Sequence, residues 1–439
     1  MKKLSFTKIF CFISFIFLLT CSIYYGTRFI KLYLKNNEEL KEEKNSLAKV
    51  IRENNEENNN FKEINNTEYF TNNTDNNYLL YSNILWRIIK INNDNSISVI
   101  SDSSLSRLAY GNQVNYNDSY IYKWLNETEE DYSGILEKHL NNKEKYLQKT
   151  ITCLDTIKQL DNKECQNTSS DNYLSLLSTN DFVNIGNKES FVINNEYFYL
   201  NNTNDKLEVW FIDDEGKVTT NKGTDIIGIR PVITIKSNID YLSGDGTKDN
   251  PYIIENETGL FGSYVKLDND LWRIYQVNET EVRLILNDYI QVKNENLEYI
   301  YSNTNSYHND YKQGSLAYYL NNTYLKTLTY KDKIKEVKWT NGYYGSNSEY
   351  DYEESLSKTI DTKVASISIG DIILNNDLED YFTLTGTKDK GSSIYTISSN
   401  GKVHTNSIQT KNYVVPTISI DKELLTKGTG TYNNPLEME

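Results

Sequence analysis

The chain has 439 residues, 13% of them aromatic, and a formal net charge of −15, from 46 Lys and Arg against 61 Asp and Glu. This share of aromatic residues excludes a wholly disordered chain, and the acidic balance makes a nucleic-acid partner unfavourable. Four Cys and three His also leave little material for a structural zinc site.

An uncharged, apolar run at residues 9–27 predicts a transmembrane helix, so residues 1–27 are expected to be a cytoplasmic tail and a single membrane span. Such a helix would extend about 28 Å, close to the ~30 Å hydrocarbon core of a bilayer. Two alternatives stay open, a cleaved signal peptide and a lipoprotein signal ending at Cys21. Basic residues after the run outnumber the three Lys before it, which by itself favours a cytoplasmic C-terminal part.

Residues 28–77 are expected to form a helical stalk and an Asn-rich linker. Tyr33, Leu40 and Leu47 recur every seven residues, but under three heptads support only a weak stalk dimer. A solvated charged helix is the favoured alternative. Residues 54–77 are polar, rich in Asn and without an apolar period, which is typical of a linker.

The rest of the chain contains the same series of short motifs twice, at residues 78–254 and 264–439. This shared order predicts two similar domains in tandem. The paired landmarks are Trp86-Arg87-Ile88 with Trp272-Arg273-Ile274, Trp124-Leu125-Asn126 with Tyr319-Leu320-Asn321, Gly216-Lys217-Val218 with Gly401-Lys402-Val403, Pro231 with Pro416, and G-x-G-T-x-x-N-P at 244–251 and 428–435.

Each copy is expected to be an α+β unit that begins and ends with strands and has helices between them. Strand alternation places Trp86 and Ile88 on one face and Leu85 and Arg87 on the other, which favours Trp86 in the core. The expected strands are 78–91, 96–100, 209–213, 217–220 and 228–235, then 264–277, 281–286, 393–397, 402–405 and 413–420, and the expected helical regions are 121–140 and 316–328.

The order of these motifs resembles a family of uncharacterised bacterial surface domains with the C-type-lectin-like fold, which formylglycine-generating enzymes share. The resemblance implies two lectin-like repeats on a membrane-anchored chain, with the C-terminal domains extracellular. The enzyme branch of this fold uses paired thiols with copper, but the second copy contains no Cys. The tripeptides E-P-N, Q-P-D and W-N-D of calcium-dependent lectins are also absent, so no cofactor or metal is expected.

Two Cys lie outside the hydrophobic run, Cys153 and Cys165, and an external location permits a disulfide between them. Free thiols are the alternative, and a metal role is disfavoured because no His stands beside them. The three His, His139, His308 and His404, are expected to be exposed polar residues.

Tyr residues are dense in the second copy and could form a binding face for a protein or a glycan. The candidate binding residues are Tyr318, Tyr319, Tyr343 and Tyr344, together with Arg230 from the R-P motif. The G-x-G-T loops are interpreted as structural turns rather than calcium sites. We therefore expect a non-catalytic surface protein that binds an unknown ligand. An enzyme with an unrecognised site and an envelope component acting through the stalk are the alternatives.

Overall fold

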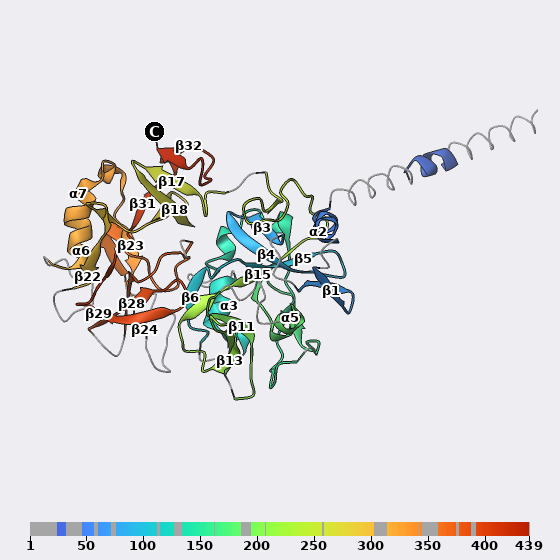
Figure 1. The fold of residues 1–439 in the computed structure, drawn as a ribbon. Coiled ribbons are helices and arrows are strands. Elements are labelled where there is room, and N and C mark those ends of the chain that lie inside the picture. Colours follow the sequence, from blue (N-terminus) through green and yellow to red (C-terminus); the bar gives the residue numbers. More distant parts are fainter. Residues whose placement is uncertain are drawn as a thin grey trace, which may run out of the picture.

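The computed structural model describes residues 24–31, 46–56, 60–71, 76–111, 115–126, 134–161, 163–185, 195–206, 208–256, 259–302, 314–341, 343–344, 359–374, 377–387 and 392–438. We call 46–256 the first half and 259–438 the second half. The two halves lie side by side (Figure 1), and each contains one larger and one smaller β-sheet.

The larger sheet of the first half runs in the order β1-β2-β4-β5-β15-β10, with β3 and then β16 beside β4, and β7 beside β15. All five residues of β5 and of β15 are buried, as expected for strands in the middle of a covered sheet. The strands are β1 (Phe61–Ile64), β2 (Thr67–Phe70), β3 (Tyr78–Tyr81), β4 (Ile84–Ile91), β5 (Ile97–Ser101), β7 (Leu147–Gln148), β10 (Leu174–Leu176), β15 (Pro231–Ile235) and β16 (Tyr252–Ile253).

The smaller sheet of the first half has the order β13-β12-β11-β14-β6. Only Arg230 separates β14 from β15, so the chain passes from the smaller sheet to the larger one at this residue. The strands are β6 (Ser106–Leu108), β11 (Phe198–Thr203), β12 (Val209–Ile212), β13 (Val218–Asn221) and β14 (Ile227–Ile229), and β8 (Thr152–Cys153) and β9 (Thr168–Ser169) form a separate pair.

The second half has sheets of the same strand order. Its larger sheet runs β26-β31-β19-β18-β17-β33-β32, which matches β10-β15-β5-β4-β3-β16, and its smaller sheet runs β22-β30-β27-β28-β29 with β24 beside β27. The strands are β17 (Tyr264–Leu267), β18 (Asp270–Val277), β19 (Glu281–Leu286), β22 (Glu298–Ile300), β24 (Tyr343–Tyr344), β26 (Val364–Ala365), β27 (Tyr381–Thr387), β28 (Ser393–Ile397), β29 (Val403–Ser407), β30 (Lys411–Tyr413), β31 (Thr417–Asp421), β32 (Leu425–Lys427) and β33 (Leu436–Met438).

Two further pairs of short strands complete the sheet structure of the second half: β20 (Gln291–Val292) with β21 (Glu295–Asn296), and β23 (Val337–Thr340) with β25 (Thr359–Thr362). The repeated sequence landmarks fall on matching strands. Trp86 lies in β4 and Trp272 in β18, and both are fully buried. Strand alternation therefore placed Trp86 correctly.

The expected α+β class is wrong, because strands hold 39% of the residues and helices only 18%. In the region expected to be helical at 121–140, the described residues form α3, which Ser119 caps and which ends before the extended Asn126, and a 3-10 turn at Glu137–His139. The region expected at 316–328 is helical from Leu316 to Thr327. Among the described residues, the α-helices with defined ends are α2 (Leu47–Asn55), α3 (Tyr120–Leu125), α4 (Lys143–Tyr146), α5 (Thr179–Ile185), α6 (Leu316–Tyr319) and α7 (Leu325–Thr327), and α6 continues into α7 through the π-helix at Leu320–Tyr324.

The expected transmembrane helix is not supported. Among the residues that the structure describes, no helix combines the length and the apolar character needed to cross a membrane. Most of the run at 9–27 lies outside these residues, and the described part of this region, 24–31, is helical.

The expected linker at 54–77 contains a β-hairpin instead. Its Asn residues supply the turn, because Asn65 and Asn66 take φ values of 51° and 59° between β1 and β2. The rings of Phe61 and Phe70 pack 4.3 Å apart across the hairpin. Helix α2 packs beside it, and Arg52 of this helix bonds Glu68 of β2 at 2.8 Å.

The strands expected at 78–91 and 264–277 are hairpins rather than single strands. Ser82 and Asn83 have φ values of 53° and 55°, so the chain reverses between β3 and β4. Asp268 has a φ of 55° at the same place between β17 and β18. Asn and Asp adopt this left-handed conformation more easily than other non-Gly residues.

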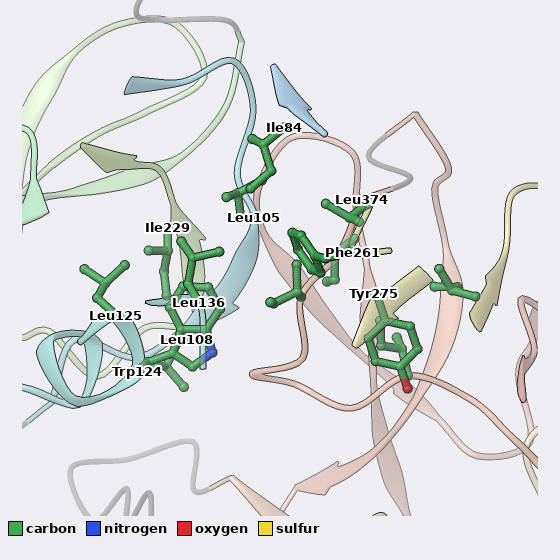
Figure 2. Packing of buried hydrophobic residues seen from close by; sticks show 14 of the residues in the cluster. Ile84, Leu105, Leu108, Trp124, Leu125, Leu136, Ile229, Phe261, Tyr275 and Leu374 are labelled. Carbon is green, nitrogen blue, oxygen red and sulfur yellow. The ribbon is translucent and has the colours of Figure 1, made fainter. Parts of the chain in front are cut away.

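The buried side chains of the two halves belong to one continuous hydrophobic cluster. Figure 2 shows members of it from both halves, among them Leu105 and Leu374. Hydrogen bonds also join the halves: the Ile373 N–H donates to the Leu105 carbonyl at 2.8 Å, and the Trp124 indole N–H donates to the Gly370 carbonyl at 2.7 Å. The two halves are therefore docked by packing as well as by hydrogen bonds.

Candidate ligand-binding cleft

A cleft of about 1100 Å³ lies between the two halves. Its walls come from the β3–β4 turn and the β12–β13 turn of the first half, and from the start of β17 and the β28–β29 turn of the second half. Among the described residues, eight charged side chains line it, and six of them are acidic: Asp102, Glu196, Asp214, Glu215, Asp377 and Glu379, against Lys248 and Arg273. These eight side chains together have a formal charge of 2 − 6 = −4.

The two G-x-G-T loops meet this cleft from opposite halves. Gly244 and Gly428, the first residues of the loops, have φ values of 97° and 86°, and a Cβ atom on either would clash with the carbonyl of the Pro that ends its loop. The turn interpretation is consistent with this geometry. Aligned on these glycines, the loops place Lys248 and Tyr432 at equivalent positions, and both residues line the cleft.

Tyr432 forms an aromatic wall with Tyr264. Their ring centroids are 5.4 Å apart and nearly perpendicular, and Tyr432 remains 64% exposed. The guanidinium carbon of Arg273 lies 4.9 Å from the centroid of the Tyr264 ring. Arg273 also donates to the carbonyls of Leu374 and Asn83, at 2.8 and 3.2 Å, so it ties the wall to both halves. Burial lowers the pKa of Arg273.

Two carboxylates at the inner end of the cleft are held by the first half. Asp102 has one oxygen 3.6 Å from Arg87 and the other 3.8 Å from Lys248. Glu196 accepts the backbone N–H of Ser104 at 2.8 Å and its hydroxyl at 2.5 Å. These contacts fix both carboxylates in place.

The outer carboxylates are more accessible. Glu215, Asp377 and Glu379 are exposed, and Asp214 is half-buried. The Asn400 amide donates to Asp214 at 3.3 Å, and the Ser399 hydroxyl donates to Glu379. The β28–β29 turn therefore meets acidic side chains from both halves at the rim.

Arg230, a predicted binding residue, is fully buried rather than exposed to a ligand. Its guanidinium donates twice to the Ser101 carbonyl, at 2.7 and 3.0 Å, and its central carbon lies 4.9 Å from the Phe198 ring centroid. Burial lowers its pKa, while Glu196 and Asp102 raise it. Arg230 thus supports the segment beneath the cleft.

Two residues of the predicted tyrosine face, Tyr318 and Tyr319, are not among the residues that line the cleft. Tyr318 and Tyr319 are half-buried on α6, and Tyr319 packs 4.8 Å from Tyr299. Tyr343 and Tyr344 form β24, which pairs with β27. The structure therefore does not bring Tyr318 and Tyr319 together with the buried Arg230 into one site. Sequence reasoning missed Lys248, Tyr264 and Tyr432, and the signal that could have identified two of them is the change from Lys to Tyr at one position of a repeated loop.

Cys153 and Cys165 are joined by a disulfide, with Cα atoms 5.7 Å apart, and neither lines the cleft. Asp155 lies close to both sulfurs, but it accepts the backbone N–H groups of Gln166 and Asn167 at 2.6 and 3.0 Å. Sulfurs bonded to each other are not thiolate ligands, so this group is a structural loop rather than a metal centre.

The expectation of three exposed His is wrong for His139, which is half-buried between the halves. His404 is exposed, and His308 lies outside the described residues. No protein-family model, curated protein or solved structure matches this chain. The lectin-like resemblance therefore stays a prediction.

Proposed function

We propose that the chain is a non-catalytic binding protein whose cleft takes a positively charged peptide segment of a partner protein. The observation that carries this proposal is the acidic lining of the cleft, which has a volume of about 1100 Å³. Among its described residues, six carboxylates outnumber two cationic side chains. Closely spaced carboxylates in a concave site raise the local concentration of cationic ligands and steer their approach. The exposed face of Tyr432 supports the same ligand, because Lys and Arg pack on aromatic rings.

The contacts of the inner carboxylates favour binding over catalysis. A general acid or base has to exchange protons with a substrate, whereas Glu196 is occupied by two donors of Ser104 and Asp102 lies beside Arg87. The lining residues that the structure describes include neither Cys nor His. An extracellular location belongs to this proposal, and the disulfide supports it, because such bonds persist in oxidising compartments.

A neutral glycan is the second candidate ligand, and the pair Tyr264 and Tyr432 favours it. An exposed ring beside carboxylates and amides, such as Asn400, can stack on a sugar and accept or donate to its hydroxyls. The two ligands differ in salt dependence. Binding of a polycation to carboxylates weakens as salt screens the charges, whereas stacking on a neutral sugar changes little.

The test is a titration of the full chain with fluorescent poly-lysine and, separately, with neutral oligosaccharides, at low and high salt. We expect salt-sensitive binding of poly-lysine that weakens at least tenfold in the double variant Glu215→Gln, Asp377→Asn. The matched control is Glu63→Gln, Glu295→Gln, which removes two exposed carboxylates outside the cleft lining and should bind like the wild type. Equal weakening in both double variants would show general charge attraction and reject the proposal. Salt-insensitive oligosaccharide binding that Tyr432→Ala abolishes would support the glycan instead.

A further inference from the structure

The contact between the two halves includes an imidazole ring with a defined proton position. His139 ends the 3-10 helix η3 (Glu137–His139) of the first half. Its Nδ1 lies 2.6 Å from the Ile135 carbonyl oxygen, and its Nε2 lies 3.1 Å from the backbone nitrogen of Val277 in the second half. Only a neutral ring with its proton on Nδ1 can donate to the carbonyl and also accept from the Val277 N–H.

The Val277 N–H lies on an edge that another strand covers in the first half. The matching residue of β4, Ile91, pairs with Glu68 of β2. On this edge of β18, β17 pairs with Asp270–Arg273, but among the described residues no strand reaches Val277, and His139 supplies its acceptor instead. The Phe261 ring packs against the imidazole, with centroids 4.8 Å apart.

We propose that protonation of His139 breaks this contact and loosens the docking of the two halves in mild acid. A protonated imidazole carries a hydrogen on Nε2 as well, so it would point a donor at the Val277 N–H, which is also a donor. The Val277 N–H would then lose its acceptor, Nε2 of His139, and the Phe261 ring that packs on the imidazole has no lone pair to replace it. Phe261 is next to Gly262, which lines the cleft, so the loosened contact lies directly behind the cleft wall. This inference does not depend on the ligand proposed above.

The surroundings of His139 do not favour the charged ring. Burial lowers its pKa below 6.5, the Ile135 carbonyl opposes this effect, and Lys138 lowers the pKa further. The carboxylates of the packed elements have other partners. Glu137, on the same turn, pairs with Lys143 at 2.9 Å.

In β19, beside Val277, the carboxylate of Glu281 also has other partners. It accepts from the Asn278 amide at 3.3 Å and lies 4.0 Å from Arg283. Because the folded pKa is below the unfolded value, the contact of His139 is complete above about pH 6.5 and is lost as the pH falls through the folded pKa.

The experiment follows the Val277 amide in the full chain by hydrogen exchange at pH 7.5 and at one pH unit below the measured midpoint of His139, with rates corrected for intrinsic exchange. We expect the protection of Val277 to fall about tenfold at the lower pH, while Val282 and Leu284 in β19 keep theirs. In the same protein, the NMR titration of the His139 ring should show a midpoint below 6.5 that coincides with this loss. His139→Gln, which keeps an acceptor without a titrating proton, should remove the pH dependence. The control His404→Gln changes an exposed His and should behave like the wild type.

Unchanged protection of Val277 across the titration of His139 would overturn the proposal. So would a pH-dependent loss that persists in His139→Gln. A simultaneous loss at Val282 and Leu284 would show global unfolding and would reject a local release. The ring titration and the exchange data on the wild type decide the question even if the variant does not fold.

Discussion

Single residues show most clearly what the sequence can and cannot predict. Trp86 was expected in the core because alternation along a strand decides which face a side chain occupies, and it is fully buried. Arg230 was expected to contact a ligand because it precedes Pro231 in the R-P motif, yet it is fully buried and bonds Ser101. A motif can identify an important residue, but the residues that surround it in the folded chain determine whether it supports the structure or contacts a ligand.

Asp371 is a buried carboxyl at the contact between the two halves. Burial raises its pKa to about 6, although the Ser368 N–H and Arg283 oppose this shift. Its carbonyl accepts the Ser106 hydroxyl from the other half at 2.8 Å, so it lies at the contact between the halves. The Asp371 carboxyl therefore binds its proton more tightly in the folded chain than in the unfolded chain, where the pKa of Asp is near 3.8. The stability that the protonated carboxyl contributes is lost as the pH rises through about 6.

We therefore expect Asp371→Asn to stabilise the chain at pH 7.5 by roughly 1–3 kcal/mol and to have no such advantage at pH 3.5. Urea unfolding at the two pH values measures the difference. The matched control is Asp181→Asn at the equivalent position of the first half, which bonds Lys90 at 2.6 Å and should destabilise. If Asp371→Asn destabilises at pH 7.5 as well, the account of a costly buried carboxylate is wrong.

Gly401 lies against the first half so closely that adding one carbon atom would disturb the docking of the two halves. Its φ is 78°, and a Cβ atom there would lie 2.6 Å from the Tyr197 carbonyl oxygen of the first half. The neighbouring Asn400 carbonyl accepts the Tyr197 N–H at 2.8 Å. Gly401→Ala should therefore cost roughly 1–3 kcal/mol of unfolding free energy, from left-handed strain together with the clash.

The control for this change is Gly259→Ala, because a Cβ at Gly259 has no neighbour closer than 3.8 Å. It should cost well under half as much in the same thermal or urea unfolding measurement. Equal effects of the two substitutions would show that the β28–β29 turn is not held against the first half.

At the scale of elements, the positions of most strands followed from the sequence, whereas their turns and partners did not. The strands at 96–100, 281–286 and 393–397 were close to their final bounds. The hairpins at Ser82-Asn83 and Asn65-Asn66 were missed because polar residues with positive φ were counted as part of a strand or of a linker. The region expected at 316–328 is helical from Leu316 to Thr327, whereas α3 already ends at Leu125. A Ser cap marks where a helix begins, while tertiary contacts decide where it ends.

The junction of β2, β4 and α5 depends on one ion pair. Lys90 of β4 lies 2.6 Å from Asp181 of α5, and the Tyr69 hydroxyl of β2 donates to the same carboxylate at 3.0 Å. Burial alone would lower the pKa of Lys90, but Asp181 raises it above its usual value. Burial also raises the pKa of Tyr69 to about 12.

Lys90→Gln places here the residue that the second half has at the equivalent position, Gln276, and leaves Asp181 without its cation. We expect a loss of about 3 kcal/mol in unfolding free energy, because an unpaired carboxylate remains largely buried. Lys335→Gln, which breaks the more exposed pair with Asp421, should have a much smaller effect. A small effect at Lys90 would indicate that Asp181 is solvated.

The whole molecule shows why the cleft could not be predicted. The repeated motifs predicted two units of similar layout, and both halves have the same strand order. The cleft, however, arises where the halves meet, through contacts such as Trp124 with Gly370, which are 246 residues apart. Periodicity describes each unit by itself and contains no information about their mutual placement, so the acidic lining became visible only in the folded chain.

The most direct test of the central claim is photo-crosslinking of the full chain to a lysine-rich peptide that carries a benzophenone group, followed by mass spectrometry. The account predicts crosslinks to the loop at 428–435, which contains Tyr432, and to the β12–β13 turn at Asp214 and Glu215, with both signals reduced in the Glu215→Gln, Asp377→Asn variant. Crosslinks concentrated on α6 at Tyr318 and Tyr319, or unchanged in that variant, would contradict it and would place binding on the tyrosine face instead.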